Sequence, residues 1–527
     1  MQFQVKKISC ALVALLLAIS WLTGCSTGPS GNPATTPPAT ASAPASTDSN
    51  STPSPSDTSS DLAPYTVDFA LPYPQADMSD QAAVEAYLND YLAQPGHLPN
   101  TKIHFDFYPS DKYATQLTLD AASGVSHDLV MGSSGWVSLS SLVSQGVISP
   151  MTSDAMNQYA PDIMSRIEAK YWPATTIAGQ VYAVPNPFVY AQPIGYVFQK
   201  DLCTQYNFDP STVNSLSDLE PFLAAVKAGS PGITPFLPDP TKNLIGSANS
   251  YLDFVQNWLA YDTKANQFEW IFDDPVIQSN AATLADFYQK GYLPANVSQV
   301  LGTGGTENMQ TGKFAVGPDA GAFDATAQKS TSAYGFPTIE QKITDFVIGT
   351  GRVQSCYVCL SATSKNPERA LMFLNYLYKD KTFANMVGYG KEGLDWNYVS
   401  GQGTDNPTVQ TVDGAKWAIW ICWISPLWDQ WPSNWNSADA LAQMKAATDE
   451  APVSPILGFT LDTDSIKTQV ASLQQLYSTA SNTMTGGTEG DAAAYITQVK
   501  QQAEAAGLQQ VLDEANKQLS AWQTANG

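Results

Sequence analysis

Residues 103–131 read IHFDFYPSDKYATQLTLDAASGVSHDLVM, and this stretch holds a strand, a helix and a second strand. Apolar and polar side chains alternate in IHFDFY, which is typical of a half-buried strand. A helix is expected over residues 113–122, and residues 128–131 form a short apolar run of the buried-strand type. Strands that alternate with helices at this spacing predict an α/β body with largely parallel sheets, whose ligands lie in loops at the carboxyl ends of strands.

Capping residues and apolar spacing predict further helices around this unit. Val84, Leu88 and Leu92 recur at helical spacing behind Ser79 and Asp80. Three more helix starts are expected at the capping box 217–220, at Asp274-Pro275 with an end at Gly291, and at Asn366-Pro367.

The N-terminus has the pattern of an export signal. Lys6 and Lys7 precede an apolar run over residues 10–22, which is too short for a typical membrane span. The run ends in Leu22-Thr23-Gly24-Cys25, which resembles the bacterial lipobox. That resemblance implies a signal peptide over residues 1–24 and a lipidated Cys25 as first mature residue. The alternative is an ordinary cleaved secretory peptide with a chance cysteine.

Residues 25–64 follow as a segment rich in Ser, Thr, Pro and Ala, in which Leu62 is the only large apolar side chain. Such a segment cannot bury enough apolar surface to offset its chain entropy, so it predicts a disordered tether. The body is then expected over residues 65–527.

The charge balance limits the ligand class. The formal net charge is -23, and the chain has three arginines, Arg166, Arg352 and Arg369. A polyanion needs a basic face, so nucleic acid is excluded as a partner and a neutral or cationic ligand is favoured.

No catalytic or metal-binding motif stands out. HExxH and GxSxG are absent, and His97, His104 and His127 are scattered. Cys356 and Cys359 have CxxC spacing but lie in an apolar stretch, which favours buried thiols over zinc or redox chemistry. Asp273 and Asp274 are adjacent, which does not suit a glycosidase pair. No enzyme, metal or cofactor is therefore predicted.

Several motifs occur in a collinear order along the body. They are GQVYAVP at 179–185, GYVFQKDL at 195–202, QTGKFAV at 310–316, ATSKNPERA at 362–370 and SPILGF at 454–459. In this order the chain resembles the extracellular solute-binding protein family 1 of ABC importers, the group that includes maltose-binding protein. The last motif resembles a lipoprotein branch with an extended C-terminal region that often accompanies oligosaccharide importers.

The resemblance implies a periplasmic-binding-protein-like type II fold of two hinge-linked α/β lobes. Lobe 1 is expected over 65–187 and 314–365, and lobe 2 over 188–313 and 366–527. The implied function is lipid-anchored capture of a solute, expected to be an oligosaccharide, on the extracellular face of the cell membrane. The implied partners are the transmembrane permease subunits of an ABC importer with their ATPase.

Candidate ligand-binding residues are aromatic or polar, and most follow expected strands or lie in the expected hinge. Trp396 is placed in a cleft-edge loop, and the family resemblance implies Trp420 and Trp423, because related sequences carry aromatic residues in that stretch. Indole faces stack on sugar rings, and polar side chains bond to hydroxyl groups. Six Trp fall within residues 417–435, of which about half are expected to be structural. The candidates are Tyr73, Gln75, Ser134, Trp136, Tyr190, Gln192, Asp319, Trp396, Trp420 and Trp423.

Three alternatives remain open from the sequence. A peptide or other polar metabolite also suits an aromatic cleft on this fold. A secreted glycoside hydrolase would need two carboxylates at a defined separation across a cleft. An anchored adhesion or scaffold module would bind no small solute.

Overall fold

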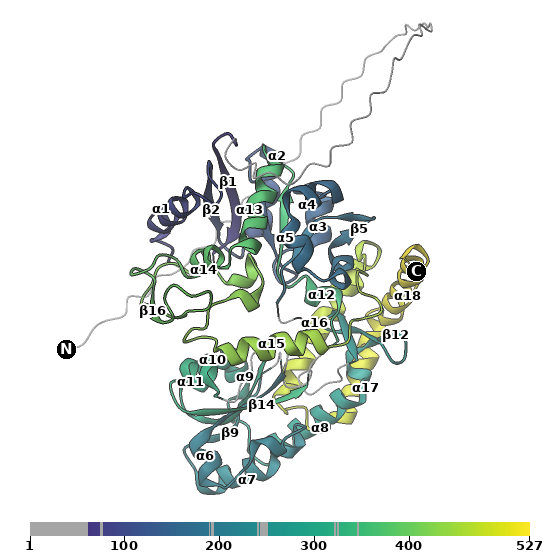
Figure 1. Cartoon of the computed structure of the whole chain (residues 1–527). Helices are drawn as coiled ribbons and strands as arrows, with labels where there is room; N and C mark the ends of the chain where they lie inside the picture. Colours follow the sequence, from purple (N-terminus) through teal and green to yellow (C-terminus); the bar gives the residue numbers. More distant parts are fainter. Residues whose placement is uncertain are drawn as a thin grey trace, which may run out of the picture. The chain divides into compact units, whose positions relative to one another are not determined.

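The computed structural model describes residues 62–73, 77–188, 190, 194–239, 242, 251–320, 323, 326–344 and 347–526 (Figure 1). The chain divides into two units, residues 1–57 and 58–527, and the second contains the folded body. The predicted signal peptide, Cys25 and the predicted tether up to residue 61 lie outside the described residues. In the described part, no helix has the length and apolar character needed to cross a membrane.

The first sheet follows from the opening strand–helix–strand unit. Its strands are β1 (Tyr65–Pro72), β2 (Thr101–Tyr108), β3 (Leu129–Gly132), β4 (Ile148–Ser149), β7 (Ala183–Pro185) and β15 (Tyr357–Ser361). Their order is β2-β1-β3-β15-β4, with β7 also paired to β15. β1 is parallel to β2 and β3, whereas β15 is antiparallel to its neighbours. The predicted unit is confirmed, because β2, α2 (Tyr113–Ser123) and β3 follow one another.

Helices from two distant parts of the chain cover this sheet. The early ones are α1 (Gln81–Leu92), α3 (Leu139–Ser144), α4 (Ser153–Tyr159) and α5 (Pro161–Arg166). The late elements are α13 (Pro367–Lys379), α14 (Lys381–Tyr389), the hairpin β16 (Trp396–Ser400) and β17 (Thr408–Thr411), and α15 (Ala438–Glu450). Phe373 and Leu374 of α13 share one core with Phe69 and Leu129 of the sheet.

The second sheet has the order β14-β8-β13-β9. Its strands are β8 (Ile194–Gln199), β9 (Thr234–Phe236), β13 (Phe314–Ala320) and β14 (Thr338–Thr344). A separate small sheet contains β10 (Leu252–Gln256), β11 (Leu259–Asp262) and β12 (Gln267–Trp270), and β5 (Thr176–Ile177) pairs with β6 (Gln180–Val181). The accompanying helices are α6 (Lys200–Gln205), α7 (Glu220–Gly229), α8 (Pro275–Gln289), α9 (Val297–Leu301), α10 (Gly305–Gln310) and α11 (Gln328–Tyr334).

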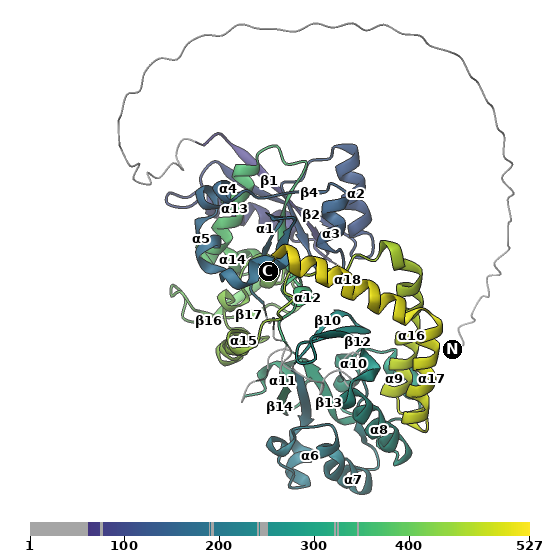
Figure 2. The same cartoon turned by 90° about the vertical axis from the view of Figure 1, so that its right-hand side faces the viewer.

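The long C-terminal helices belong to the second core. They are α16 (Lys467–Thr485), α17 (Ala492–Ala505) and α18 (Leu508–Asn526). Leu473 and Met484 are buried in the same core as Ile277 and Leu284 of α8. Figure 2 shows α16 and α17, in yellow, beside α8.

The lobe boundaries predicted from the sequence need two corrections. Residues 314–344, predicted in lobe 1, contribute β13 and β14 to the second sheet, where Val316 pairs with Phe198. Residues 367–450, predicted in lobe 2, pack on the first core. Residues 314–344 join the second sheet because β13 and β14 both pair with β8, which is more than one hundred residues earlier in the chain. Residues 367–450 stay with the first core because α13 follows β15 after a short connection and packs onto the sheet that the chain has just left.

Two of the segments that join the cores run side by side. Ile348, on the way from β14 to α12 (Thr350–Val353), pairs with Val453, on the way from α15 to the C-terminal helices. The Ile348 N–H donates to the Pro452 carbonyl, and the Ser454 N–H donates to the Ile348 carbonyl, both at 2.8 Å. These hydrogen bonds make the two crossings one joint.

The helix starts show where local signals were sufficient. The Asp274 carboxylate accepts N–H bonds from Val276 and Ile277 at 2.9 and 3.1 Å, as predicted for α8. Asn366 caps α13 in the same way. The capping box at 217–220 is wrong, because the Asp218 carboxylate holds the N–H groups of Asn214 and Ser215 and α7 begins only at Glu220.

Four cysteines occur in the described part, and all are buried free thiols. This agrees with the interpretation of Cys356 and Cys359 as core residues. Burial raises the pKa of the Cys359 thiol well above its ordinary value, so the reactive thiolate is disfavoured.

A buried imidazole connects three elements of the first core. The Nδ1 atom of His127 lies 3.1 Å from the Asp106 carboxylate, and its Nε2 atom lies 3.1 Å from that of Asp120. Burial opposes protonation, but the hydrogen bonds and charges of Asp106 and Asp120 outweigh it and raise the pKa of His127. Folding therefore favours the protonated form of His127, which lies between the two carboxylates.

This arrangement predicts a pH-dependent stability. Because the pKa of His127 is raised on folding, its stabilising contribution is complete below pH ~6.5 and is lost as the pH rises through the folded-state pKa. The difference in free energy of unfolding between wild type and His127→Gln should therefore shrink from pH 6 to pH 9 in urea titrations. Thr115→Gln, an exposed change on α2, is the control and should parallel wild type. A constant difference for His127→Gln would contradict the assignment.

Candidate functional site

A cavity of about 540 Å³ lies where segments of both lobes meet. The first lobe contributes Ser134 and Ser138, which follow β3, and the second contributes Ile194, Ala320 and the β10 residues Asp253–Gln256. The crossing segment at α12 adds Thr350, Gly351, Arg352, Gln354 and Ser355, and the start of the C-terminal region adds Phe459, Thr460 and Leu461. The volume is in the range of small-molecule sites.

An acid and a base lie together in the lining of this cavity. Asp253 is 4% exposed, and its carboxylate lies against the joint, because a Cβ atom at Gly349 would come within 1.7 Å of Asp253 Oδ1. Residue 349 must therefore be glycine for this approach. Arg352, one turn into α12, provides the opposite charge.

The burial of this pair shifts both acidities. Burial raises the pKa of Asp253 to about 6, against the opposing effects of a Ser454 hydrogen bond and the Arg352 charge. Burial likewise lowers the pKa of Arg352 to about 10, with the Asp253 charge opposing. Near neutral pH the cavity therefore offers a carboxylate acceptor and a guanidinium donor, which together suit hydroxyl groups.

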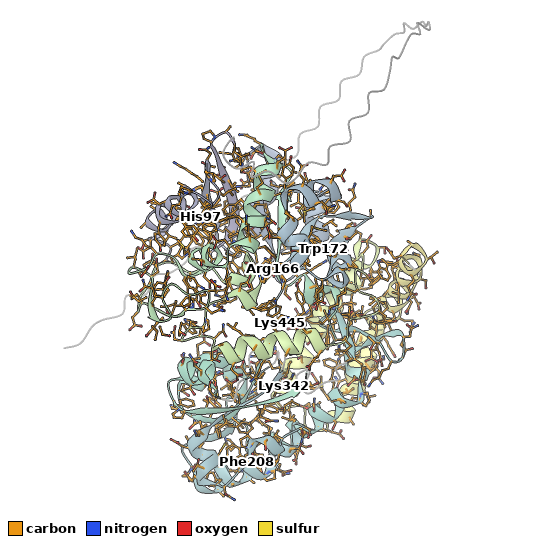
Figure 3. The ribbon with its side chains drawn as sticks, viewed as in Figure 1. His97, Arg166, Trp172, Phe208, Lys342 and Lys445 are labelled. Carbon is orange, nitrogen blue, oxygen red and sulfur yellow. The ribbon has the colours of Figure 1, made fainter. Side chains whose placement is uncertain are left out.

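The other two arginines are structural. Arg166 of α5, labelled in Figure 3, forms an ion pair of 2.7 Å with Asp429. Arg369 is 4% exposed and donates to the carbonyls of Ala63 and Asn100 and to the Thr101 hydroxyl. Of the three arginines that the sequence analysis noted, Arg352 is the one that lines the cavity.

Three indoles form a row that begins beside the cavity. Trp136 lies between the lining residues Ser134 and Ser138, and its ring meets Trp423 edge to face at 5.0 Å. Trp423 in turn lies 5.6 Å from Trp420. Trp136 is 38% exposed, Trp420 62% and Trp423 only 3%. This tryptophan row (Trp136, Trp423, Trp420) presents two indoles to solvent, supported by a third that is buried.

Backbone bonds hold the start of the row. The Ser134 N–H donates to the Gln354 carbonyl at 2.8 Å, and its hydroxyl donates to the Gly351 carbonyl at 3.1 Å. Trp136 follows in a tight turn closed by its N–H to the Ser133 carbonyl. The loop after β3 is thus tied to α12, which also carries Arg352.

Two further candidates occupy strand ends. Tyr73 follows β1, is 42% exposed and stacks on Phe107 at 5.9 Å. Asp319 is the penultimate residue of β13, where its carboxylate accepts the Ala320 N–H and lies 3.5 Å from the Lys329 ammonium. Neither side chain is part of the cavity lining, so the structure does not bring them together with the tryptophan row.

Two candidates are core residues instead. Trp396, predicted at a cleft edge, is 1% exposed and packs with Tyr389 and Trp431, and its Nε1–H donates to the Gly390 carbonyl. Tyr190 is fully buried and donates to the Asn186 carbonyl. Each side chain has a large apolar ring and one polar atom. In both, the ring is buried and the polar atom is hydrogen-bonded within the protein, so neither side chain is available to contact a solute. Gln75 and Gln192 lie outside the described residues.

Sequence reasoning missed most of the polar lining. Asp253, Gln256 and Asn257 lie on a strand and turn with no motif, and Gln354 follows a short helix. Three signals pointed here: the loop after the strand at 128–131, which made Ser134 a candidate, the scarcity of arginine, which made Arg352 noticeable, and the C-terminal motif that ends at Phe459.

The chemistry of the lining indicates binding. Within the part of the chain that the structure describes, no group of three or more His, Cys, Asp and Glu is arranged to hold a metal ion. Among the described lining residues, Asp253 is the single carboxylate. The arrangement can accept and donate hydrogen bonds and can stack on a flat apolar face.

The burial of the two later indoles, Trp420 and Trp423, predicts very different losses of stability when each is removed. Trp423→Ala should lower the free energy of unfolding by about 3–5 kcal/mol, because it leaves a cavity in a packed core. Trp420→Ala should change it by about 0.5 kcal/mol or less, because that ring is mostly in water. Urea unfolding of both variants at one pH measures this. A large loss for Trp420→Ala would show that its ring supports the fold.

Comparison with known proteins agrees with the fold. The model of bacterial extracellular solute-binding proteins matches residues 75–382, and that of a domain of unknown function (DUF3502) matches residues 455–524. A carbohydrate ABC transporter substrate-binding protein of Streptococcus pneumoniae serotype 4 is 25% identical over 473 residues, covering 84% of this chain and 91% of that protein.

Solved structures extend the comparison. The N-glycan transport solute binding protein NgtS of Streptococcus pneumoniae superposes with a TM-score of 0.75 at 19% identity, covering 88% of this chain and 100% of that chain. FusA of the same species, in complex with kestose, gives a TM-score of 0.57 at 14% identity, with coverage of 88% and 100%. The two-lobed type II fold predicted from the sequence is confirmed. With a family model that covers more than half of its length, the chain belongs to the bacterial extracellular solute-binding protein family.

Proposed function

We propose that this protein captures an oligosaccharide between its lobes and delivers it to an ABC importer. The observation that carries the proposal is the tryptophan row, which begins in the loop between Ser134 and Ser138, two residues that line a polar cavity. Sugars combine apolar C–H faces with rings of hydroxyl groups. The exposed indoles of Trp136 and Trp420 match the faces, and Asp253, Arg352 and Ser134 match the hydroxyls.

The relatives support the ligand class. NgtS has been solved with Man1GlcNAc and with Man5GlcNAc, and FusA with kestose. The S. pneumoniae relative of similar length is named as a carbohydrate substrate-binding protein. Neutral glycans also agree with an acidic chain whose cavity lining has two cationic side chains, Arg352 near Asp253 and Lys242 paired with Asp239 at 3.1 Å.

The cellular setting belongs to the same proposal. Cys25 carries the lipid, residues 25–64 form the tether, and the body works on the extracellular face of the cell membrane. There it docks onto the permease subunits, whose ATPase drives import. Because one acyl chain anchors only marginally, stable attachment requires more than one lipid chain on this cysteine.

A hydrolase is the less supported reading. Glycoside hydrolysis uses two carboxyl groups, about 5–10 Å apart across the scissile bond. The described lining supplies Asp253 alone, and Arg352 lies beside it. We therefore expect the glycan to be released from the site without cleavage.

Isothermal titration with Man1GlcNAc, Man5GlcNAc, kestose and a neutral tripeptide tests the ligand class. We expect saturable binding of at least one glycan, none of the tripeptide, and no glycan cleavage during overnight incubation. Binding of the tripeptide alone would favour a peptide receptor, and release of a shorter glycan would favour a hydrolase. No response to any solute would favour an adhesion or scaffold module.

The tryptophan row gives the matched variants. Trp136→Ala should weaken binding of the preferred glycan about tenfold, because one stacking face is lost. Trp435→Ala is the control, since Trp435 is likewise exposed, at 51%, but belongs neither to the row nor to the cavity lining. Titration of both variants measures the difference. Equal losses would assign the effect to something other than the row.

A further inference from the structure

The C-terminal region, residues 455–526, is the part of the chain for which only a domain of unknown function is matched. It is firmly part of the second lobe. Phe459 packs on Phe268 at 5.7 Å and meets the Trp522 ring at 6.2 Å. Tyr477 stacks on Phe272 at 5.6 Å. These contacts place its first residues at a fixed position relative to the small β10–β12 sheet.

Those first residues reach the cavity and are fastened at both ends. The Gly458 N–H donates to the Thr350 hydroxyl of α12 at 2.8 Å. Gly458 has a φ of +100°, and a Cβ atom there would lie 2.8 Å from the Pro173 carbonyl oxygen, so only glycine fits. At the other end, the Asp462 backbone N–H and carbonyl bond to the Gln518 side-chain amide, each at 2.8 Å.

Between these two attachments, Phe459, Thr460 and Leu461 line the cavity. Phe459 and Leu461 are buried, whereas Thr460 is exposed and faces the space that a ligand would fill. Because this segment is fixed at both ends and its Thr460 side chain is exposed in the cavity lining, it would limit how far a ligand can extend on that side. The tryptophan row, by contrast, begins on the loop after β3 and ends at Trp420, which is 62% exposed.

We propose that the C-terminal region closes one end of the glycan site, so that the protein binds oligosaccharides by a chain end. The terminal sugar lies in the cavity against Thr460, Asp253 and Arg352, and the following sugars lie over the exposed indoles of the tryptophan row. The proposal rests on the proposed function. It assigns a role to the 455–524 match and divides the site into an enclosed part and an open part.

The two parts predict different dependences on ligand length. Thr460→Trp fills the enclosed part and should weaken Man1GlcNAc and Man5GlcNAc alike, by about tenfold or more. Trp420→Ala removes a stacking face in the open part and should weaken Man5GlcNAc about fivefold, with less than about a twofold change for Man1GlcNAc. Isothermal titration of each variant with both glycans measures these effects.

Controls separate binding from folding. Ser465→Trp adds the same indole at an exposed position five residues further along, outside the cavity lining, and should bind both glycans as wild type does. Thermal unfolding of every variant should match wild type within a few degrees. Thr460→Leu, a smaller change, should give an intermediate loss if Thr460→Trp does not fold.

Three outcomes would overturn the proposal. Unchanged affinity in both Thr460 variants would show that the C-terminal region does not bound the site. Equal weakening of both glycans by Trp420→Ala would show that the row is not an extension for longer chains. In either case wild-type binding would leave the proposed function standing. No binding of either glycan by wild type would overturn both.

Discussion

The pairing of Ile348 with Val453 is the constraint on which the site depends. It fastens two of the segments that join the lobes to each other, through hydrogen bonds of 2.8 Å on both sides of Ile348. α12 begins directly after one of these segments, and the C-terminal region begins directly after the other. The Asp253 carboxylate from the second lobe lies against the same joint at Gly349. The polar lining of the cavity therefore surrounds the joint between the lobes. In clamshell proteins the lobes close around the ligand by motion at such a hinge.

Few arginines and few exposed indoles lie around this joint. Two of the three arginines hold the first lobe together, and the third faces the cavity beside a buried carboxylate whose pKa is raised to about 6. The exposed indoles of Trp136 and Trp420 both contact the buried indole of Trp423, so the packing of Trp423 positions the other two. In the proposed site, hydroxyl geometry in the cavity would set selectivity and the tryptophan row would accommodate longer ligands.

Local signals in the sequence were reliable where the interaction is local. The alternation in residues 103–108 predicted β2, and the Asp274 and Asn366 caps predicted the starts of α8 and α13. Lobe membership failed because it depends on which distant sheet a segment meets. Residues 314–344 pair with β8, and residues 367–450 pack on the first core. The spacing of apolar residues along the chain does not indicate either arrangement.

For the site, the sequence by itself determined the chemical materials: many indoles, few arginines, no catalytic motif, and an order of motifs that resembles solute-binding proteins. The tertiary structure decided which of these side chains are buried in a core and which are exposed or line the cavity. It buried Trp396 and Tyr190, exposed Trp136 and Trp420, and brought Asp253 to Arg352. The reason is physical, because burial and proximity result from the packing of segments that are distant along the chain, such as those of Trp136 and Trp423, whereas composition and spacing report only on neighbours along the chain.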